Sequence, residues 1–169
     1  MATQPRIAFT PVKPLTGLSL AQESFYEAAA QTYKPGAVVQ LVSGLLQECG
    51  ADPVLIMGVA AGDGKNASAG TARQTVYLAH PDILFKGNLS DAAGTAISEQ
   101  SDVGKYYGIA KDAVSGKWYV DKGDTTNKRV IVWGFWDGVQ DGVQAAVGDT
   151  LTHVYFQFGH SYFQGGHTS

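Results

Sequence analysis

The sequence predicts a mostly β protein, an antiparallel β-barrel or β-sandwich (β-tulip-like) with an extended N-terminal arm and one short helix. Short stretches rich in β-branched and aromatic residues follow one another from residue 37 to residue 158, with Gly, Pro and Asp clusters between them. Glycine is frequent, with 21 residues, and only 16% of the chain is charged, as is typical of a turn-rich β protein. Strands do not alternate with helical patterns, which disfavours a parallel α/β sheet.

The first 18 residues are predicted to form the arm, because prolines at positions 5, 11 and 14 hold the backbone extended. The apolar side chains between these prolines need a surface to cover them. That surface is either the protein's own barrel or a neighbouring subunit, and the sequence leaves both open. The residues expected to bind a partner are Arg6, Ile7, Phe9, Val12 and Leu15.

The short helix is predicted over residues 19–32. Ser19 can cap its first turn, and Gln22 follows three residues later, as in a capping box. Phe25 anchors the apolar positions that follow helical spacing. Pro35 then prevents the helix from continuing.

The β domain is predicted to contain eight strands. The strand at 129–136 is apolar on both faces, so it needs a second cover from a loop, the arm or another subunit. The last strand alternates between an apolar and a polar face, and His153 on its polar face is expected to meet solvent. The predicted strands are residues 37–46, 54–60, 74–80, 83–86, 106–112, 117–121, 129–136 and 151–158.

The chain is expected to divide into an arm with its possible helix (1–35), a β-barrel domain (36–158) and a C-terminal tail (159–169). Between the last two strands, residues 137–148 contain the tetrapeptide Asp-Gly-Val-Gln twice in succession. Two copies are too few for a repeat fold, and Asp-Gly favours tight turns. This stretch is therefore predicted to be a hairpin extension.

Charge and composition disfavour several kinds of partner. The net charge is −3 and the basic residues are scattered, which argues against a nucleic-acid partner. The longest apolar run, residues 54–61, is much shorter than the roughly 20 residues that span a bilayer, so no membrane partner is expected. The first residues lack the pattern of a signal peptide. The single cysteine, Cys49, is expected to be a small, half-buried turn residue.

No motif in the sequence predicts a cofactor, a metal or a catalytic residue, and the chain is expected not to be an enzyme. The glycines at 62–66 lack the spacing of a phosphate-binding loop. Histidines seven residues apart match no zinc pattern. Aspartates in the turns serve turn geometry. A small β-barrel enzyme such as a cupin stays an alternative, and it would require clustered His and carboxylate ligands.

Three segments carry a resemblance to a known family. They are residues 33–39 (YKPGAVV), residues 52–60 (DPVLIMGVA), and the turn at 147–151 (VGDTL) that leads into Val154-Tyr155-Phe156. In this order, over residues 33–158, the chain resembles the head-decoration, or capsid cement, proteins of tailed bacteriophages. The resemblance implies a β-barrel or β-tulip-like domain whose N-terminal arm, residues 2–18 here, becomes ordered on docking.

The resemblance also implies a function. It makes the chain a non-enzymatic virion structural protein, made in the host cytoplasm, that binds the major capsid protein on the outer surface of the head as a homotrimer. There it would stabilise the head against internal pressure. The alternative is a carbohydrate-binding β-sandwich module of a phage fibre or receptor-binding protein, with an aromatic platform built from Trp118, Trp133 or Trp136.

Overall fold

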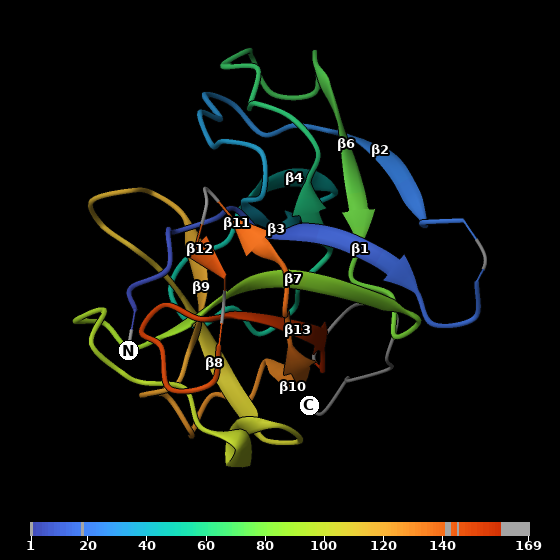
Figure 1. The fold of residues 1–169 in the computed structure, drawn as a ribbon. Helices are drawn as coiled ribbons and strands as arrows, with labels where there is room; N and C mark the ends of the chain where they lie inside the picture. The colour runs from blue at the N-terminus through green and yellow to red at the C-terminus, as the bar shows by residue number, and fades with distance from the viewer. Residues whose placement is uncertain (1, 18, 141–142, 145, 160–169) are drawn as a thin grey trace.

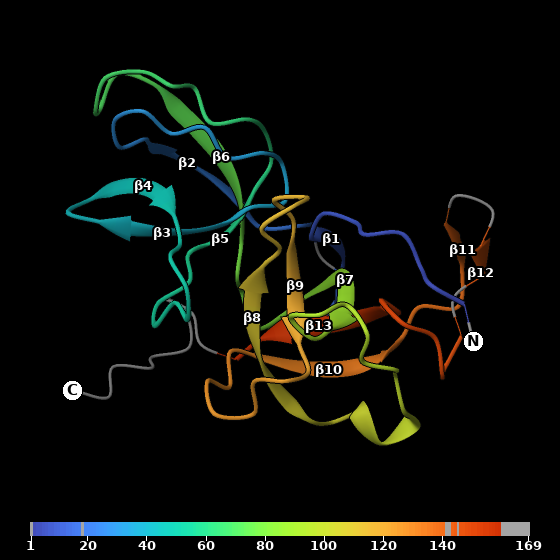
Figure 2. The ribbon, with the colours of Figure 1, turned by 90° about the vertical axis from the view of Figure 1, so that its left-hand side faces the viewer.

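A closed barrel and a second, curled sheet make up the fold of this chain (Figures 1 and 2). A computed structural model describes residues 2–17, 19–140, 143–144 and 146–159. The predicted fold class is confirmed at this level, because most of the ordered structure is β-strand. Within the described residues the structure has no α-helix, and a single 3-10 turn, η1, lies at Gln100–Asp102.

The barrel closes because the last strand of the sheet, β9, pairs back with the first, β7. The order is β7-β13-β10-β8-β9, and β9 then pairs in parallel with the end of β7, where Leu89 faces Val120. Closure removes the free edges that an open sheet would expose. The barrel strands are β7 (Ile83–Ser90), β8 (Tyr106–Lys111), β9 (Trp118–Asp121), β10 (Val130–Phe135) and β13 (His153–Phe158).

The second sheet is antiparallel, in the order β2-β6-β5-β3-β4. It curls so that its two outer strands approach each other, and the Ala28 backbone N–H donates to Leu46 O at 2.8 Å. In Figure 2 this sheet lies above the barrel. Its strands are β2 (Gln22–Tyr26), β3 (Val38–Val42), β4 (Leu45–Glu48), β5 (Gly58–Ala60) and β6 (Arg73–Leu78).

The first strand, β1 (Thr10–Pro14), pairs antiparallel with the first half of β7, with Thr10 opposite Lys86. Proline fits this strand because it is an edge strand, where one row of N–H groups has no ladder partner. The N-terminal segment therefore packs along the protein's own barrel, which is one of the two options that the sequence left open. Residues before position 35 supply one strand to each sheet.

The helix predicted over residues 19–32 is wrong, because β2 occupies Gln22–Tyr26. This strand pairs with β6 along its whole length, for example Ser24 with Thr75, and its Phe25 packs against the shared core. The helical pattern held one large apolar residue. Strand pairing satisfies the backbone and partly buries that same residue against the core, so tertiary contacts override the weak local preference.

The other predicted strands are present with changed limits. The stretch 37–46 is a hairpin, β3 and β4, which turns at Ser43 and Gly44, both with positive φ. The predicted hairpin extension is present as β11 (Val139–Gln140) and β12 (Val143–Gln144), and its turn at 141–142 lies outside the described residues. The predicted tail lies almost wholly outside them too.

One hydrophobic core joins the barrel to the curled sheet, because buried residues from both form a single cluster. In the barrel it centres on aromatic rings, with Phe9 and Phe156 centroids 4.6 Å apart and Phe85 and Phe158 centroids 5.0 Å apart. Phe9 enters from the N-terminal segment. It occupies the space above Gly87, where any side chain would overlap its ring.

Candidate functional site

The five N-terminal residues predicted to bind a partner divide into two groups. Phe9 is only 1% exposed and belongs to the core of its own chain. Arg6 is also engaged, because its Nη2 lies 3.4 Å from Asp112 Oδ1 and its guanidinium lies over the Tyr119 ring. These side chains hold the segment on the barrel, so they do not offer a free surface.

The remaining three residues lie nearer solvent. The Ile7 backbone N–H donates to Asn88 Oδ1 at 2.7 Å, and the Ile7 side chain is half-buried. Val12 and Leu15 are 38% and 44% exposed. Of the predicted set, Val12 and Leu15 are therefore the apolar side chains that a partner could reach.

Asp149 fixes the start of the chain to the barrel. Its Oδ1 accepts the Ala2 backbone N–H at 2.6 Å, and its Oδ2 accepts Gln4 Nε2 at 2.9 Å. Chiefly through the hydrogen bond from Ala2, these contacts hold the pKa of Asp149 below the ordinary carboxyl value, against the opposing effect of burial. The attachment therefore depends on the ionised carboxylate.

We expect acid to release this attachment. Because the folded pKa of Asp149 is depressed, its contribution to stability is present above the unfolded carboxyl pKa, about 4, and is lost as pH falls through the folded value. Hydrogen exchange of the Gln4 amide, which donates to Thr150 O, should accelerate relative to core amides below about pH 4. In Asp149→Asn the exchange should be fast already at neutral pH, and slow exchange there would contradict the assignment.

The outer face of the barrel carries exposed aromatic rings. Trp133 lies at a bulge in β10 between Val132 and Gly134, where it is 49% exposed and donates from Nε1 to Gln157 Oε1 at 3.1 Å. Beside it, Tyr106 is 47% exposed and lies opposite Ile131 in the β8–β10 pairing. This is the outward side of the strand predicted to need a second cover.

The N-terminal segment covers only one end of that face, and it buries His153. The prediction that His153 meets solvent is wrong: the ring is fully buried, with Nε2 2.9 Å from Pro5 O and its centroid 5.3 Å from that of Trp136. Asn88 on β7 also donates to Pro5 O. Two polar residues on the outward side, His153 and Asn88, thus contact the same carbonyl oxygen of the segment that covers them.

The three tryptophans considered for a sugar platform are not equivalent. Trp118 is buried and donates from Nε1 to Glu48 Oε1 at 3.1 Å. Lys86 covers the ring of Trp136, with Nζ 4.1 Å from its centroid. Trp133 alone of the three offers a half-exposed ring.

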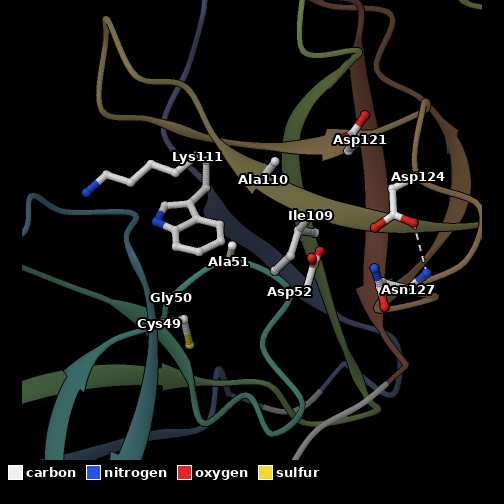
Figure 3. Close-up of a pocket in the computed structure, with 11 residues that line it drawn as sticks. Cys49, Gly50, Ala51, Asp52, Ile109, Ala110, Lys111, Asp121, Asp124 and Asn127 are labelled. Carbon is white, nitrogen blue, oxygen red and sulfur yellow. Dashed lines mark hydrogen bonds between the residues drawn. The ribbon is translucent and has the colours of Figure 1, made fainter.

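A hollow of about 630 Å³ lies between the loop after β4 and strands β8 and β9 (Figure 3). Asp52 and Asp124 lie on one side of it and Lys111 on the other. Cys49 forms part of the wall; it is almost fully buried, and burial raises the pKa of its thiol. Burial also raises the pKa of the nearby Asp121, helped by the charge of Asp124.

Glu48 joins the two sheets at this hollow. Besides the Trp118 indole, its carboxylate binds Lys111 Nζ at 2.7 Å, so one β4 side chain contacts two barrel strands. The sequence did not single out this residue, because the contact joins positions 63 and 70 residues apart. The polar groups found here fasten the sheets together.

We expect Glu48→Ala to lower the free energy of unfolding by about 1–3 kcal/mol, because the buried indole N–H of Trp118 then lacks its acceptor. Glu48→Gln keeps an acceptor and should cost less. Exposed Glu23→Ala serves as the control and should change stability by no more than about 0.5 kcal/mol. Urea denaturation monitored by tryptophan fluorescence measures all three, and equal losses for Ala and Gln would contradict the role of the hydrogen bond.

Within the described part of the chain, no group of three or more His, Cys, Asp or Glu side chains is arranged to hold a metal ion. Two of the four histidines, His160 and His167, lie outside that part. The described residues also include no helix long and apolar enough to cross a membrane. The site features that the structure does place together are the aromatic outer face and the hollows beside β8.

Comparison with known proteins adds no assignment. No family model, no curated protein and no solved structure matches this chain.

Proposed function

We propose that this chain is a non-enzymatic structural protein of a tailed phage, a decoration protein that binds the major capsid protein on the outer surface of the head. The observation that carries the proposal is the exposed aromatic face of the closed barrel, around Tyr106 and Trp133. Exposed aromatic rings on a fixed β scaffold are the kind of side chain that anchors protein interfaces. The family resemblance supplies the identity of the partner.

The scaffold suits that role because little of it needs to become ordered on binding. The aromatic rings stand on strands of a barrel whose edges are paired, and Trp133 is further held by Gln157. A preformed surface loses less conformational entropy when it docks. The N-terminal segment would then add Val12 and Leu15 as a second contact from the edge of the barrel.

A homotrimer made in the host cytoplasm and assembled onto expanded heads completes the proposal. Three linked copies raise the effective concentration of each binding surface, so contacts that are weak singly hold together. Resistance to internal pressure needs many such contacts spread over the shell and requires no reaction chemistry.

The proposal is tested by mixing the purified protein with expanded, undecorated heads and separating them on a gradient. We expect the protein to sediment with the heads, and Trp133→Ala to weaken that binding at least about tenfold, as for a central aromatic anchor. Tyr26→Ala removes a comparably exposed ring from the curled sheet and is the matched control. Wild-type protein that stays at the top of the gradient would refute the proposal.

Carbohydrate binding stays a second candidate on one specific observation. The half-exposed Trp133 ring lies beside the Gln157 amide, and an aromatic face next to a hydrogen-bonding group is a combination that can hold a sugar ring. A glycan array tests it. Binding to a defined glycan that Trp133→Ala abolishes and Tyr26→Ala preserves would support this function, and an array without signal would refute it.

A further inference from the structure

We infer that a basic hollow on the barrel binds an acidic segment of a protein partner. The hollow, about 620 Å³ in volume, lies where the start of β8 meets the loop between β9 and β10. It is open to solvent and separate from the hollow that Glu48 bridges. The residues that line it are Lys105, Tyr106, Tyr107, Lys122, Thr125 and Lys128.

The hollow concentrates positive charge on a negative protein. The chain carries 12 lysines and arginines and a net charge of −3, yet three of the six described lining residues are lysines and none is acidic. Lys122 already binds Asp102 and Glu99. Lys105 and Lys128 form no ion pair among the residues that the structure describes, and Lys105 Nζ donates only to the neutral Ser101 Oγ, at 3.4 Å, so no carboxylate there neutralises either charge.

The backbone that carries these lysines is held firmly. Asp124 Oδ1 accepts the N–H groups of Thr126 at 3.0 Å and Asn127 at 2.9 Å, which fixes the loop just before Lys128. The Gly108 N–H donates to Asp124 O and ties the loop to β8. On the other side, Val132 N–H donates to Lys105 O at 3.0 Å. A fixed site loses less entropy on binding than a mobile one.

The neighbouring surface shows what kind of anion fits. Tyr106 lines the hollow and also belongs to the aromatic outer face, where it lies opposite Ile131. A ligand that reaches both must carry acidic groups next to apolar ones, as a peptide of Glu, Asp and Leu does. Nucleic acid fits less well, because its binding depends on many phosphate contacts and this protein is acidic overall.

The acidic segment would belong to the major capsid protein, and this identity alone rests on the proposed function. Charge complementarity of this kind chiefly raises the association rate of the two proteins and their selectivity for each other. Binding through the hollow should therefore weaken as salt rises, because exposed charges are screened.

The test uses a fluorescein-labelled Glu-Leu-Glu-Glu-Leu-Glu peptide and fluorescence anisotropy at low salt. We expect saturable binding to the wild type, and Lys105→Glu/Lys128→Glu to weaken it about tenfold. The matched control, Lys13→Glu/Lys65→Glu, makes the same change in net charge at two other exposed lysines and should bind within about twofold of wild type. All the substituted side chains are exposed, and thermal unfolding verifies that each variant folds.

Four outcomes would overturn the inference. The first two are that the peptide does not bind the wild type saturably, or that peptide binding is weakened equally in both double variants. The others are that a single-stranded oligonucleotide of matched charge binds more tightly than the peptide, or that Lys105→Glu/Lys128→Glu changes the oligomeric mass of the protein. Head binding separates this inference from the proposed function. If the wild type binds the peptide and not the heads, the hollow is an acidic-peptide site and the proposed function is wrong. If the wild type binds the heads and shows no saturable binding to the peptide, the proposed function is supported and the inference about the hollow is wrong.

Discussion

Phe9→Ala is expected to lower the free energy of unfolding by about 3–5 kcal/mol, the usual cost of removing a buried aromatic ring. The Phe9 ring is almost fully buried and packs against Phe156 and, at a wider 6.5 Å between centroids, Phe158. Its loss should also loosen the segment that it anchors, so the Ile7 amide, which donates to Asn88, should lose protection from hydrogen exchange. Chemical denaturation and exchange measure the two effects.

A second substitution makes this prediction sharper. Gly87 has no positive φ to preserve, yet a Cβ there would overlap the Phe9 ring and lie 3.1 Å from Phe156 Cε1. Gly87→Ala should therefore destabilise the wild type by about 1–3 kcal/mol through overpacking. In the Phe9→Ala background the ring is absent, so the same substitution should cost much less.

The double-mutant cycle should accordingly show a favourable coupling of about 1–3 kcal/mol between the two positions. Val12→Ala provides the control on the same segment, because Val12 is exposed and should change stability by about 0.5 kcal/mol or less. Additive effects of Phe9→Ala and Gly87→Ala would show that Phe9 does not occupy the space above Gly87.

Local patterns were sufficient for the strands that alternate or are continuously apolar. The predictions at 74–80, 106–112, 117–121 and 129–136 each begin and end within two residues of β6, β8, β9 and β10. In these stretches the side chains themselves prefer a pleated surface with at least one buried face. The local signal and the tertiary structure therefore agree.

Local patterns failed where a distant segment decides the structure. β1 contains two prolines and is a strand only because β7 offers it an edge. The alternation along the last strand predicts a solvent-facing His153, yet the carbonyl of Pro5, 148 positions earlier, covers it. The same limit explains why the candidate site was found only in part. Tyr106 lay on a predicted strand, whereas the lysines of the basic hollow come together only after β8 packs beside the β9–β10 loop.

Lys122→Met is expected to lower the free energy of unfolding by about 3 kcal/mol, because it removes the counter-charge of a buried carboxylate. Asp102 is fully buried and accepts Tyr107 Oη at 2.6 Å, the Glu99 N–H at 2.8 Å and Lys122 Nζ at 3.0 Å. The expected loss lies at the lower end of the range for buried pairs, because solvent partly reaches the Lys122 side chain.

The direction in which stability changes with pH follows from the pKa of Asp102. Burial alone would raise the pKa of Asp102, but the hydrogen bonds from Tyr107 and Glu99 and the charge of Lys122 hold it below the ordinary carboxyl value. In the wild type this contribution to stability is present above the unfolded pKa, about 4, and lost as pH falls through the folded value. In Lys122→Met the pKa of Asp102 in the folded state should rise, which favours the protonated form of this carboxyl. The difference in the free energy of unfolding between wild type and variant should therefore narrow as pH falls from 7 toward 4.

The double variant Lys122→Met/Asp102→Asn separates loss of charge balance from loss of packing. It removes both charges and leaves a side-chain amide at position 102 that can accept one of the two remaining hydrogen bonds, so it should be more stable at neutral pH than Lys122→Met alone. Its stability should also lose the pH dependence assigned to the Asp102 carboxylate. If the double variant is the less stable of the two, or if the gap between wild type and Lys122→Met stays constant with pH, the lysine acts through its aliphatic packing and the electrostatic explanation is wrong.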